Sequence, residues 1–194
     1  MQYIICAENR TRSTLLCESL ENTGFVGDPF QSWPLKDGVG GCKVTWGNFC
    51  EFKEDVDISS VKFIWLGRYN KIRQAISFLK ARKRDSFCSA DDNDLLSDGV
   101  VLRLGEVLKI VGWISVQDSM WHEFFRTNNI DPLILWYSDL DTEDLQVNTV
   151  NRVLEFLEVT ERVDQVDVFM EPQSSQWDID VYNNFCDKYT NEEW

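Results

Sequence analysis

The stretch that decides the fold is YIICAENRTRSTLL, residues 3–16. Its apolar first part predicts a buried strand over 2–7, and the turn rich in hydroxyls and arginine leads into a helix predicted over 13–22. The free N–H groups in the first turn of such a helix point at one spot, where the helix dipole also favours negative charge. Hydroxyls and guanidiniums add charge-assisted hydrogen bonds. The stretch therefore predicts a binding site for a phosphate-like group.

The turn at residues 8–12 contains no glycine. A nucleoside-triphosphatase loop requires G-x-x-x-x-G-K-[ST], and a dinucleotide-binding fold requires G-x-G-x-x-G directly after its first strand. Neither pattern is present after this strand. The two common nucleotide-binding loops are therefore disfavoured.

The segment at residues 10–16 instead resembles the 5′-phosphosulfate-binding loop of sulfotransferases. The closest resemblance is to the bacterial trehalose 2-sulfotransferase-like family, whose loop reads R-S-G-S-T-L-L where this chain has Arg10-Thr11-Arg12-Ser13-Thr14-Leu15-Leu16. Further matches follow in the family's order up to about residue 158. They are a T-G-x-x-G-x-P turn at 23–29, a G-x-K-hydrophobic-x-W segment at 41–46, a second phosphate-binding strand and helix within 63–78, and a Y-x-D-L turn at 137–140.

The order of apolar segments predicts an α/β fold. Continuous apolar strands that alternate with helices indicate a mainly parallel sheet flanked by helices, and the resemblance implies a P-loop-like sulfotransferase fold. We expect one domain over 1–194, with the tail at 171–194 left unassigned and a mobile loop at 88–98. The other expected elements are strands at 43–46, 61–66 and 133–137 and helices at 71–83, 99–128 and 147–157. The range 99–128 is expected to form one or two helices, with Leu108 among the residues that face inward.

Composition excludes several classes of function. The formal net charge of −14 and the pI near 4.4 argue against a nucleic-acid-binding protein, which needs a basic surface. No apolar run reaches the roughly 18 residues of a membrane span, and the N-terminus lacks the basic region of a signal peptide. Six cysteines without C-x-x-C spacing, and His122 as the only histidine, predict reduced thiols and no metal site. We therefore expect a cytoplasmic protein.

The resemblance implies transfer of a sulfuryl group from 3′-phosphoadenosine 5′-phosphosulfate to a hydroxyl of a carbohydrate or a small alcohol. Arg10 would stabilise charge on the leaving oxygen, and Arg68 with Ser77 would hold the 3′-phosphate. Thr11, Ser13 and Thr14 would bind the 5′-phosphate and sulfuryl oxygens, although helix capping by Ser13 and Thr14 would use the same geometry. Arg12 replaces the family's loop glycine, and it either crowds the donor or adds a second cation to the donor site.

The acceptor side departs from the family at Gln31, which stands where the family places the carboxylate thought to deprotonate the acceptor. An amide cannot act as a general base near neutral pH, but it can position a hydroxyl. Lys43 matches a family lysine near the acceptor, and the alternative for it is an edge-strand lysine that reaches to solvent. The possible substitute bases are Asp28, Glu51 and His122, each of which also has an ordinary turn, surface or packing role.

Tryptophans supply the last predicted contacts. We expect Trp33 and Trp46, rather than Trp113 or Trp121, to line the acceptor cleft, because sugar rings stack on indole faces; the alternative for each is a core position. Two classes of function stay open: an active sulfotransferase, and an inactive descendant that binds a phosphonucleotide or another partner. A homodimer is compatible with either.

Overall fold

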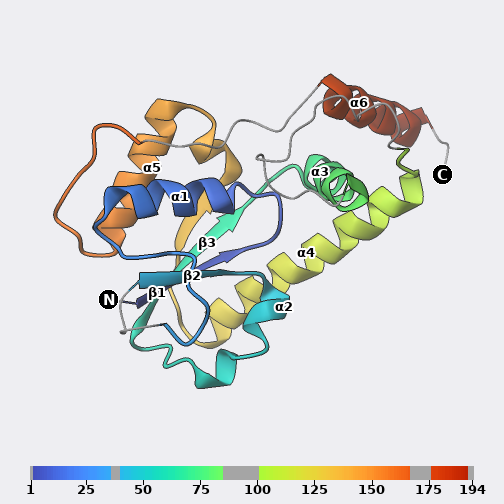
Figure 1. Cartoon of the computed structure of the whole chain (residues 1–194). Coiled ribbons are helices and arrows are strands. Elements are labelled where there is room, and N and C mark those ends of the chain that lie inside the picture. The colour runs from blue at the N-terminus through green and yellow to red at the C-terminus, as the bar shows by residue number, and fades with distance from the viewer. Residues whose placement is uncertain (1, 36–39, 85–100, 167–175, 192–194) are drawn as a thin grey trace. The chain divides into compact units, whose positions relative to one another are not determined.

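The computed structural model describes residues 2–35, 40–84, 101–166 and 176–191 of the 194-residue chain (Figure 1). The chain divides into two compact units. The first comprises Met1–Tyr69 and Val116–Val168, and the second comprises Asn70–Ser115 and Phe169–Trp194. A single domain over the whole chain stays a prediction, and the mobile loop expected at 88–98 lies outside the described residues.

The first unit is built on a four-stranded parallel sheet in the order β2-β1-β3-β4. Its central strand β1 pairs with β2 on one side and β3 on the other, so that Ile5 lies opposite both Lys43 and Ile64. The predicted parallel sheet is therefore confirmed. The strands are β1 (Gln2–Ala7), β2 (Gly40–Val44), β3 (Val61–Gly67) and β4 (Leu133–Trp136).

Helices cover both faces of this sheet, as the alternation of apolar segments predicts. The helices α1 (Ser13–Thr23) and α5 (Glu143–Phe156) lie on one face, and α2 (Trp46–Phe49) and the C-terminal half of α4 (Leu104–Thr127) lie on the other (Figure 1). A short 3-10 helix, η2 (Lys53–Asp55), precedes β3. Because both faces are buried, the strands are continuous apolar runs rather than alternating ones.

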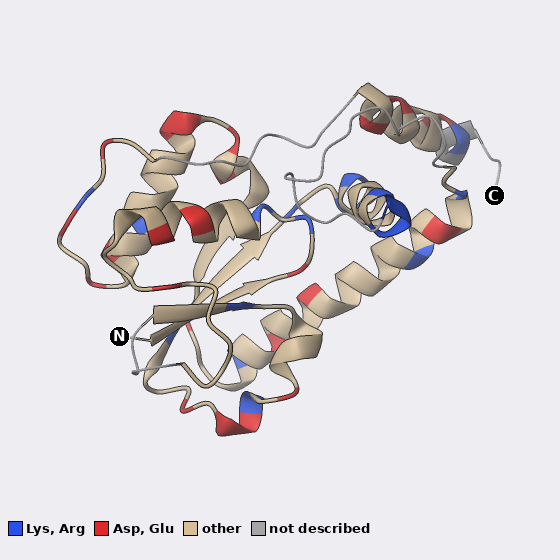
Figure 2. Cartoon of the chain, in the orientation of Figure 1, with Lys and Arg blue, Asp and Glu red and all other residues tan. Residues whose placement is uncertain are grey.

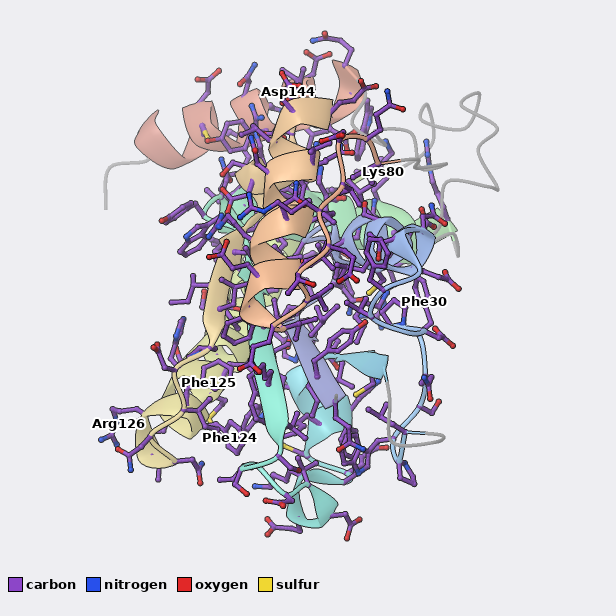
Figure 3. All side chains as sticks on the ribbon, turned by 90° about the vertical axis from the view of Figure 1, so that its left-hand side faces the viewer. Phe30, Lys80, Phe124, Phe125, Arg126 and Asp144 are labelled. Atoms are coloured by element: carbon purple, nitrogen blue, oxygen red, sulfur yellow. The ribbon has the colours of Figure 1, made fainter. Side chains whose placement is uncertain are left out.

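The core between the sheet and α4 is largely aromatic. Phe49 is fully buried, and its ring centroid lies 4.9 Å from that of Trp121 and 5.0 Å from that of Phe124. Trp121 is also fully buried and stacks on Phe125. Figure 3 shows Phe124 and Phe125 beside the sheet and Arg126 pointing away from it. Edge-to-face and stacked rings of this kind add to the hydrophobic stabilisation of a core.

Capping residues move three boundaries away from the predicted ones. The strand expected at 43–46 ends at Val44, because the Oγ1 of Thr45 accepts the N–H of Asn48 at 3.4 Å and starts α2 at Trp46. The helix expected from 147 begins at Glu143, where the Oγ1 of Thr142 accepts the N–H of Leu145 at 3.3 Å. The last strand ends before Tyr137, which opens the 3-10 helix η5 (Tyr137–Leu140).

The second unit packs α3 (Lys71–Arg84), the N-terminal half of α4 and α6 (Gln176–Asn191). Its core holds Ala75, Ile76, Leu79, Val107, Ile114 and Phe185. Lys80 joins α3 to α6 by an ion pair with Asp178 at 3.0 Å. Leu108, which was predicted to face inward, is 40% exposed. Within the described parts of the chain, no helix is long and apolar enough to cross a membrane.

We expect Phe49→Ala to destabilise the protein by about 3–5 kcal/mol, because truncating a fully buried phenylalanine removes apolar contacts and leaves a cavity. Urea unfolding followed by tryptophan fluorescence measures the change. The matched control is Phe25→Ala, because Phe25 is 43% exposed and should contribute little. Equal losses in the two variants would contradict the aromatic core described above.

Candidate functional site

All four parallel strands end at the same edge of the sheet, where α/β proteins bind their ligands. The predicted residue Arg68 directly follows β3, and Arg10 lies three residues after the end of β1. These are the neighbouring strands at which the chain changes direction across the sheet. Figure 2 shows basic positions gathered where these two strands end. The edge therefore collects positive charge in a protein whose net charge is −14.

The turn after β1 has an unusual backbone. Arg10 (φ 68°) and Arg12 (φ 66°) both lie in the left-handed region, which normally favours glycine and costs other residues roughly 1–2 kcal/mol. Arg12 thus keeps the left-handed backbone that glycine adopts readily, at the cost that a side chain adds there. Residues held in such conformations are frequent at binding sites.

The first turn of α1 carries no side-chain cap. The N-cap residue is Arg12, whose side chain makes no capping hydrogen bond, and Ser13 and Thr14 lie inside the helix. The alternative in which Ser13 or Thr14 serves as the N-cap is therefore wrong. An N-terminus without a side-chain cap directs its N–H groups and its dipole at an external anion.

Thr11 does not present its hydroxyl to the site. Its side chain is 1% exposed, and Oγ1 donates to the carbonyl of Glu8 at 2.8 Å. This local bond tightens the turn, as Ser and Thr hydroxyls commonly do. The predicted contact of this hydroxyl with the donor is therefore not supported, and only the backbone of Thr11 could contribute.

Glu8 is a buried residue at this edge that the sequence analysis did not single out. Its side chain is 1% exposed, and Oε1 accepts the N–H of Trp46 at 2.9 Å. The carboxylate thereby ties the end of β1 to the beginning of α2. A glutamate directly after a buried strand was the available signal, because a carboxylate in that place needs a polar partner.

Lys43 and Thr14, both predicted site residues, are in contact. The Nζ of Lys43 donates to the Oγ1 of Thr14 at 2.8 Å and lies 5.6 Å from the ring centroid of Phe30. The contact brings the ammonium group of β2 to the first turn of α1. Lys43 is therefore directed at the predicted site, and the alternative of a lysine that only reaches to solvent is disfavoured.

Glu18 lies one turn along α1 from Thr14, and the sequence analysis did not identify it either. Burial raises its pKa, the positive charge of Lys43 lowers it, and the negative charge of Glu21 raises it. Its Oε2 is buried without a hydrogen-bond partner among the described residues. A carboxylate of raised pKa beside a lysine is a candidate proton acceptor.

Arg12 and Arg68 meet on the ring of Tyr137. The Cζ of each guanidinium lies 4.0 Å from the ring centroid. Arg68 also donates from Nη1 to the carbonyl of Arg10 at 3.1 Å. Arg12 donates from Nη1 to the carbonyl of Tyr137 at 3.3 Å and forms an ion pair with Asp141. Ser77, the predicted partner of Arg68, belongs to the second unit, so their shared role stays a prediction.

Gln31 has a structural partner at the opposite end of β2. Its Nε2 donates to the carbonyl of Asp28 at 3.3 Å, and the same carbonyl accepts the N–H of Gly41 at 3.2 Å. The Oδ1 of Asp28 accepts the N–H of Phe30 at 2.7 Å, so this side chain also holds the turn. These contacts explain both residues structurally, and their predicted catalytic roles stay untested.

The remaining predicted residues are placed as follows. Trp46 is only 9% exposed and lies in the aromatic core, 5.0 Å from Trp121 between ring centroids, which disfavours sugar stacking on it. Trp33 is half-buried and stacks on Phe52 at 5.6 Å. His122 is exposed, with its ring 4.6 Å from that of Trp65.

Among the residues that the structure describes, no group of three or more His, Cys, Asp or Glu could hold a metal.

We expect Glu18→Gln to stabilise the protein at pH 7 but not near pH 4. The raised pKa means that folding favours protonated Glu18, so this contribution is present below the unfolded pKa of about 4.3 and is lost as the pH rises through the folded pKa. Glutamine stays neutral and avoids that loss. Melting temperatures across this pH range measure the difference.

The control for this prediction is Glu51→Gln, because Glu51 is an exposed carboxylate of the same unit. It should change the melting temperature little at any pH. A Glu18→Gln variant that is less stable than wild type at pH 7 would show that the carboxylate is stabilised by its surroundings and not desolvated.

Comparison with known proteins identifies the family of the chain. The family model described as Stf0 sulphotransferase matches residues 2–58 and 51–190 of the chain. A search of curated proteins found no match. The matched residues include the β1–α1 turn, Lys43, Arg68 and the turn after β4. The chain therefore belongs to the Stf0 sulphotransferase family.

Proposed function

We propose that the protein transfers a sulfuryl group from 3′-phosphoadenosine 5′-phosphosulfate to a hydroxyl of a small acceptor, with a carbohydrate as the favoured class. The observation that carries the proposal is the uncapped first turn of α1, where Lys43 bonds Thr14 and where Arg12 and Arg68 contact the ring of Tyr137. Such a donor carries several anionic groups. A helix N-terminus surrounded by guanidiniums and an ammonium is suited to binding them.

The proposed reaction forms a bond between the acceptor oxygen and sulfur while the bond from sulfur to the bridging oxygen breaks. The bridging oxygen leaves on the 5′-phosphate, and the proton of the acceptor hydroxyl passes to a base. Arg10 and Lys43 stabilise the charge that develops on the leaving oxygen. The backbone N–H groups of Ser13 and Thr14 bind the 5′-phosphate, and Arg68 with Ser77 holds the 3′-phosphate.

The identity of the base follows from the contacts of the candidates. Gln31 is an amide that donates to a carbonyl, and Asp28 accepts a backbone N–H within its own turn. Glu18 has a raised pKa and lies on the same helix as Thr14, which bonds Lys43. We therefore favour Glu18 over Asp28, Glu51 and His122 as the proton acceptor.

Binding tests the donor class first. We expect adenosine 3′,5′-bisphosphate to bind more tightly than adenosine 5′-monophosphate, and Arg68→Ala to lose about tenfold to hundredfold in affinity for the bisphosphate alone, since a charge-assisted contact contributes roughly 1.5–3 kcal/mol. Isothermal titration calorimetry measures both ligands. Arg126→Ala is the control, because Arg126 is exposed and pairs with Glu123 on α4.

Two outcomes separate the possibilities. A wild-type protein that binds neither nucleotide would contradict the proposed donor. A protein that binds the bisphosphate but transfers no radiolabelled sulfuryl group to sugars or small alcohols would instead be an inactive member that retains the nucleotide site.

We expect Gln31→Glu not to increase the transfer rate, because a carboxylate would face the carbonyl of Asp28 to which the amide now donates. Glu18→Gln should lower the rate by about 10²–10⁴-fold if Glu18 accepts the proton. The measurement is the pH dependence of kcat for both variants beside wild type. A higher rate in Gln31→Glu together with full activity in Glu18→Gln would contradict the assignment of Glu18 as the proton acceptor.

Two further aspects are proposed with the function. A cytoplasmic location fits the buried cysteines Cys6, Cys17 and Cys42, which are free thiols. Burial raises the pKa of Cys17 and of Cys42 to about 12, which keeps both thiols protonated and unreactive.

A homodimer is compatible with the proposed chemistry, and sedimentation analysis would determine the oligomeric state.

A further inference from the structure

One aromatic ring contacts two cations of the proposed donor site. Tyr137 opens η5 directly after β4, and the guanidiniums of Arg12 and Arg68 each lie 4.0 Å from its ring centroid. Arg12 comes from the turn after β1, and Arg68 follows β3. The ring thus joins three segments at one edge of the sheet.

Two guanidiniums at one ring repel each other, and additional partners offset this repulsion. Arg12 has the carboxylate of Asp141 and the carbonyl of Tyr137, and Arg68 has the carbonyl of Arg10. The negative face of the ring attracts both cations, and a planar guanidinium stacks well on an aromatic surface. These contacts fix two side chains that would otherwise populate many rotamers.

Fixed cations are useful in a site that binds anions. A ligand that must order a long side chain loses affinity for each one immobilised, and prior ordering avoids this loss. The Cζ atoms of Arg12 and Arg68 are held by one ring, so their orientations are set before any anion arrives.

We propose that Tyr137 is a positioning residue, which holds Arg12 and Arg68 in the orientation that receives the anionic groups of the donor. The role belongs to the ring and not to the phenol hydroxyl, because both contacts are made with the ring face. The ligand part of the proposal rests on the proposed function. The positioning of the two guanidiniums is independent of any ligand.

The first experiment uses the ligand-free protein. The side-chain Nε–H resonances of Arg12 and Arg68 should show ring-current shifts in wild type and in Tyr137→Phe, and should lose them in Tyr137→Leu. Two-dimensional ¹H–¹⁵N spectra, assigned with Arg12→Gly and Arg68→Ala, record these signals. Unchanged resonances in Tyr137→Leu would overturn the proposal.

The second experiment measures affinity for adenosine 3′,5′-bisphosphate by calorimetry. Tyr137→Leu should weaken binding about tenfold, because both guanidiniums lose the ring that orients them, while Tyr137→Phe should stay within about twofold because it keeps the ring. Phe156→Leu is the matched control, because the Nζ of Lys62 lies 5.3 Å from the Phe156 ring, at the far end of the sheet from this edge.

A series of fluorinated phenylalanines at position 137 covers the case in which Tyr137→Leu fails to fold. Fluorine reduces the negative potential of the ring face while the ring's size and shape are largely kept, so affinity should fall stepwise with each added fluorine. A constant affinity across the series would overturn the proposal. So would fully additive losses in both double variants, Tyr137→Leu with Arg12→Gly and Tyr137→Leu with Arg68→Ala, because a residue that acts through these two side chains loses part of its effect when either one is gone.

The outcomes for the two proposals are distinguishable. Failure of the wild-type protein to bind the bisphosphate would contradict the proposed function and leave the resonance shifts as the test of positioning. Tight wild-type binding that is equal in Tyr137→Leu would contradict the positioning role and leave the proposed function intact.

Discussion

The turn that joins β1 to α1 is the constraint on which the rest of the site depends. Arg10 and Arg12 adopt left-handed backbone there, at a cost of roughly 1–2 kcal/mol each. The turn is held from inside, where Thr11 donates to the carbonyl of Glu8 and the Glu8 carboxylate accepts the N–H of Trp46. Because these buried bonds fix its interior, the turn can present the uncapped start of α1 and its basic side chains at the edge of the sheet.

The electrostatics of this edge are local. The chain carries a formal charge of −14, yet exposed charges farther away than about 8 Å are largely screened at physiological ionic strength. The neighbouring groups therefore decide what the edge attracts. Asp141 offsets the charge of Arg12, while Arg68 bonds a neutral carbonyl. The ion pair limits repulsion between the two guanidiniums, and the charge of Arg68 is not offset by that carboxylate.

Much of the fold could be predicted from the sequence, because buried parallel strands are continuous apolar runs and the motif after the first strand identifies α1. The contact between Lys43 and Thr14 was not predicted, because the sequence analysis assigned them to the acceptor side and the donor side. Other features depend on tertiary contacts that no local pattern encodes. Thr45 ends β2 early and places Trp46 in the core. Arg68 and Arg12, the two cations that contact Tyr137, lie 69 and 125 residues before it in the chain.

Glu18 shows how burial and charge can act in opposite directions on one group. Burial raises its pKa and so strengthens it as a base, whereas the positive charge of Lys43 lowers the pKa. A general base works best when its pKa approaches the operating pH, because it must be both deprotonated and able to take a proton. Burial without Lys43 would leave the carboxyl more protonated, and Lys43 without burial would leave a weaker base. The placement of Glu18 one turn from the residue that bonds Lys43 agrees with the proton-accepting role proposed for it, and the burial of its Oε2 without a hydrogen-bond partner among the described residues costs stability.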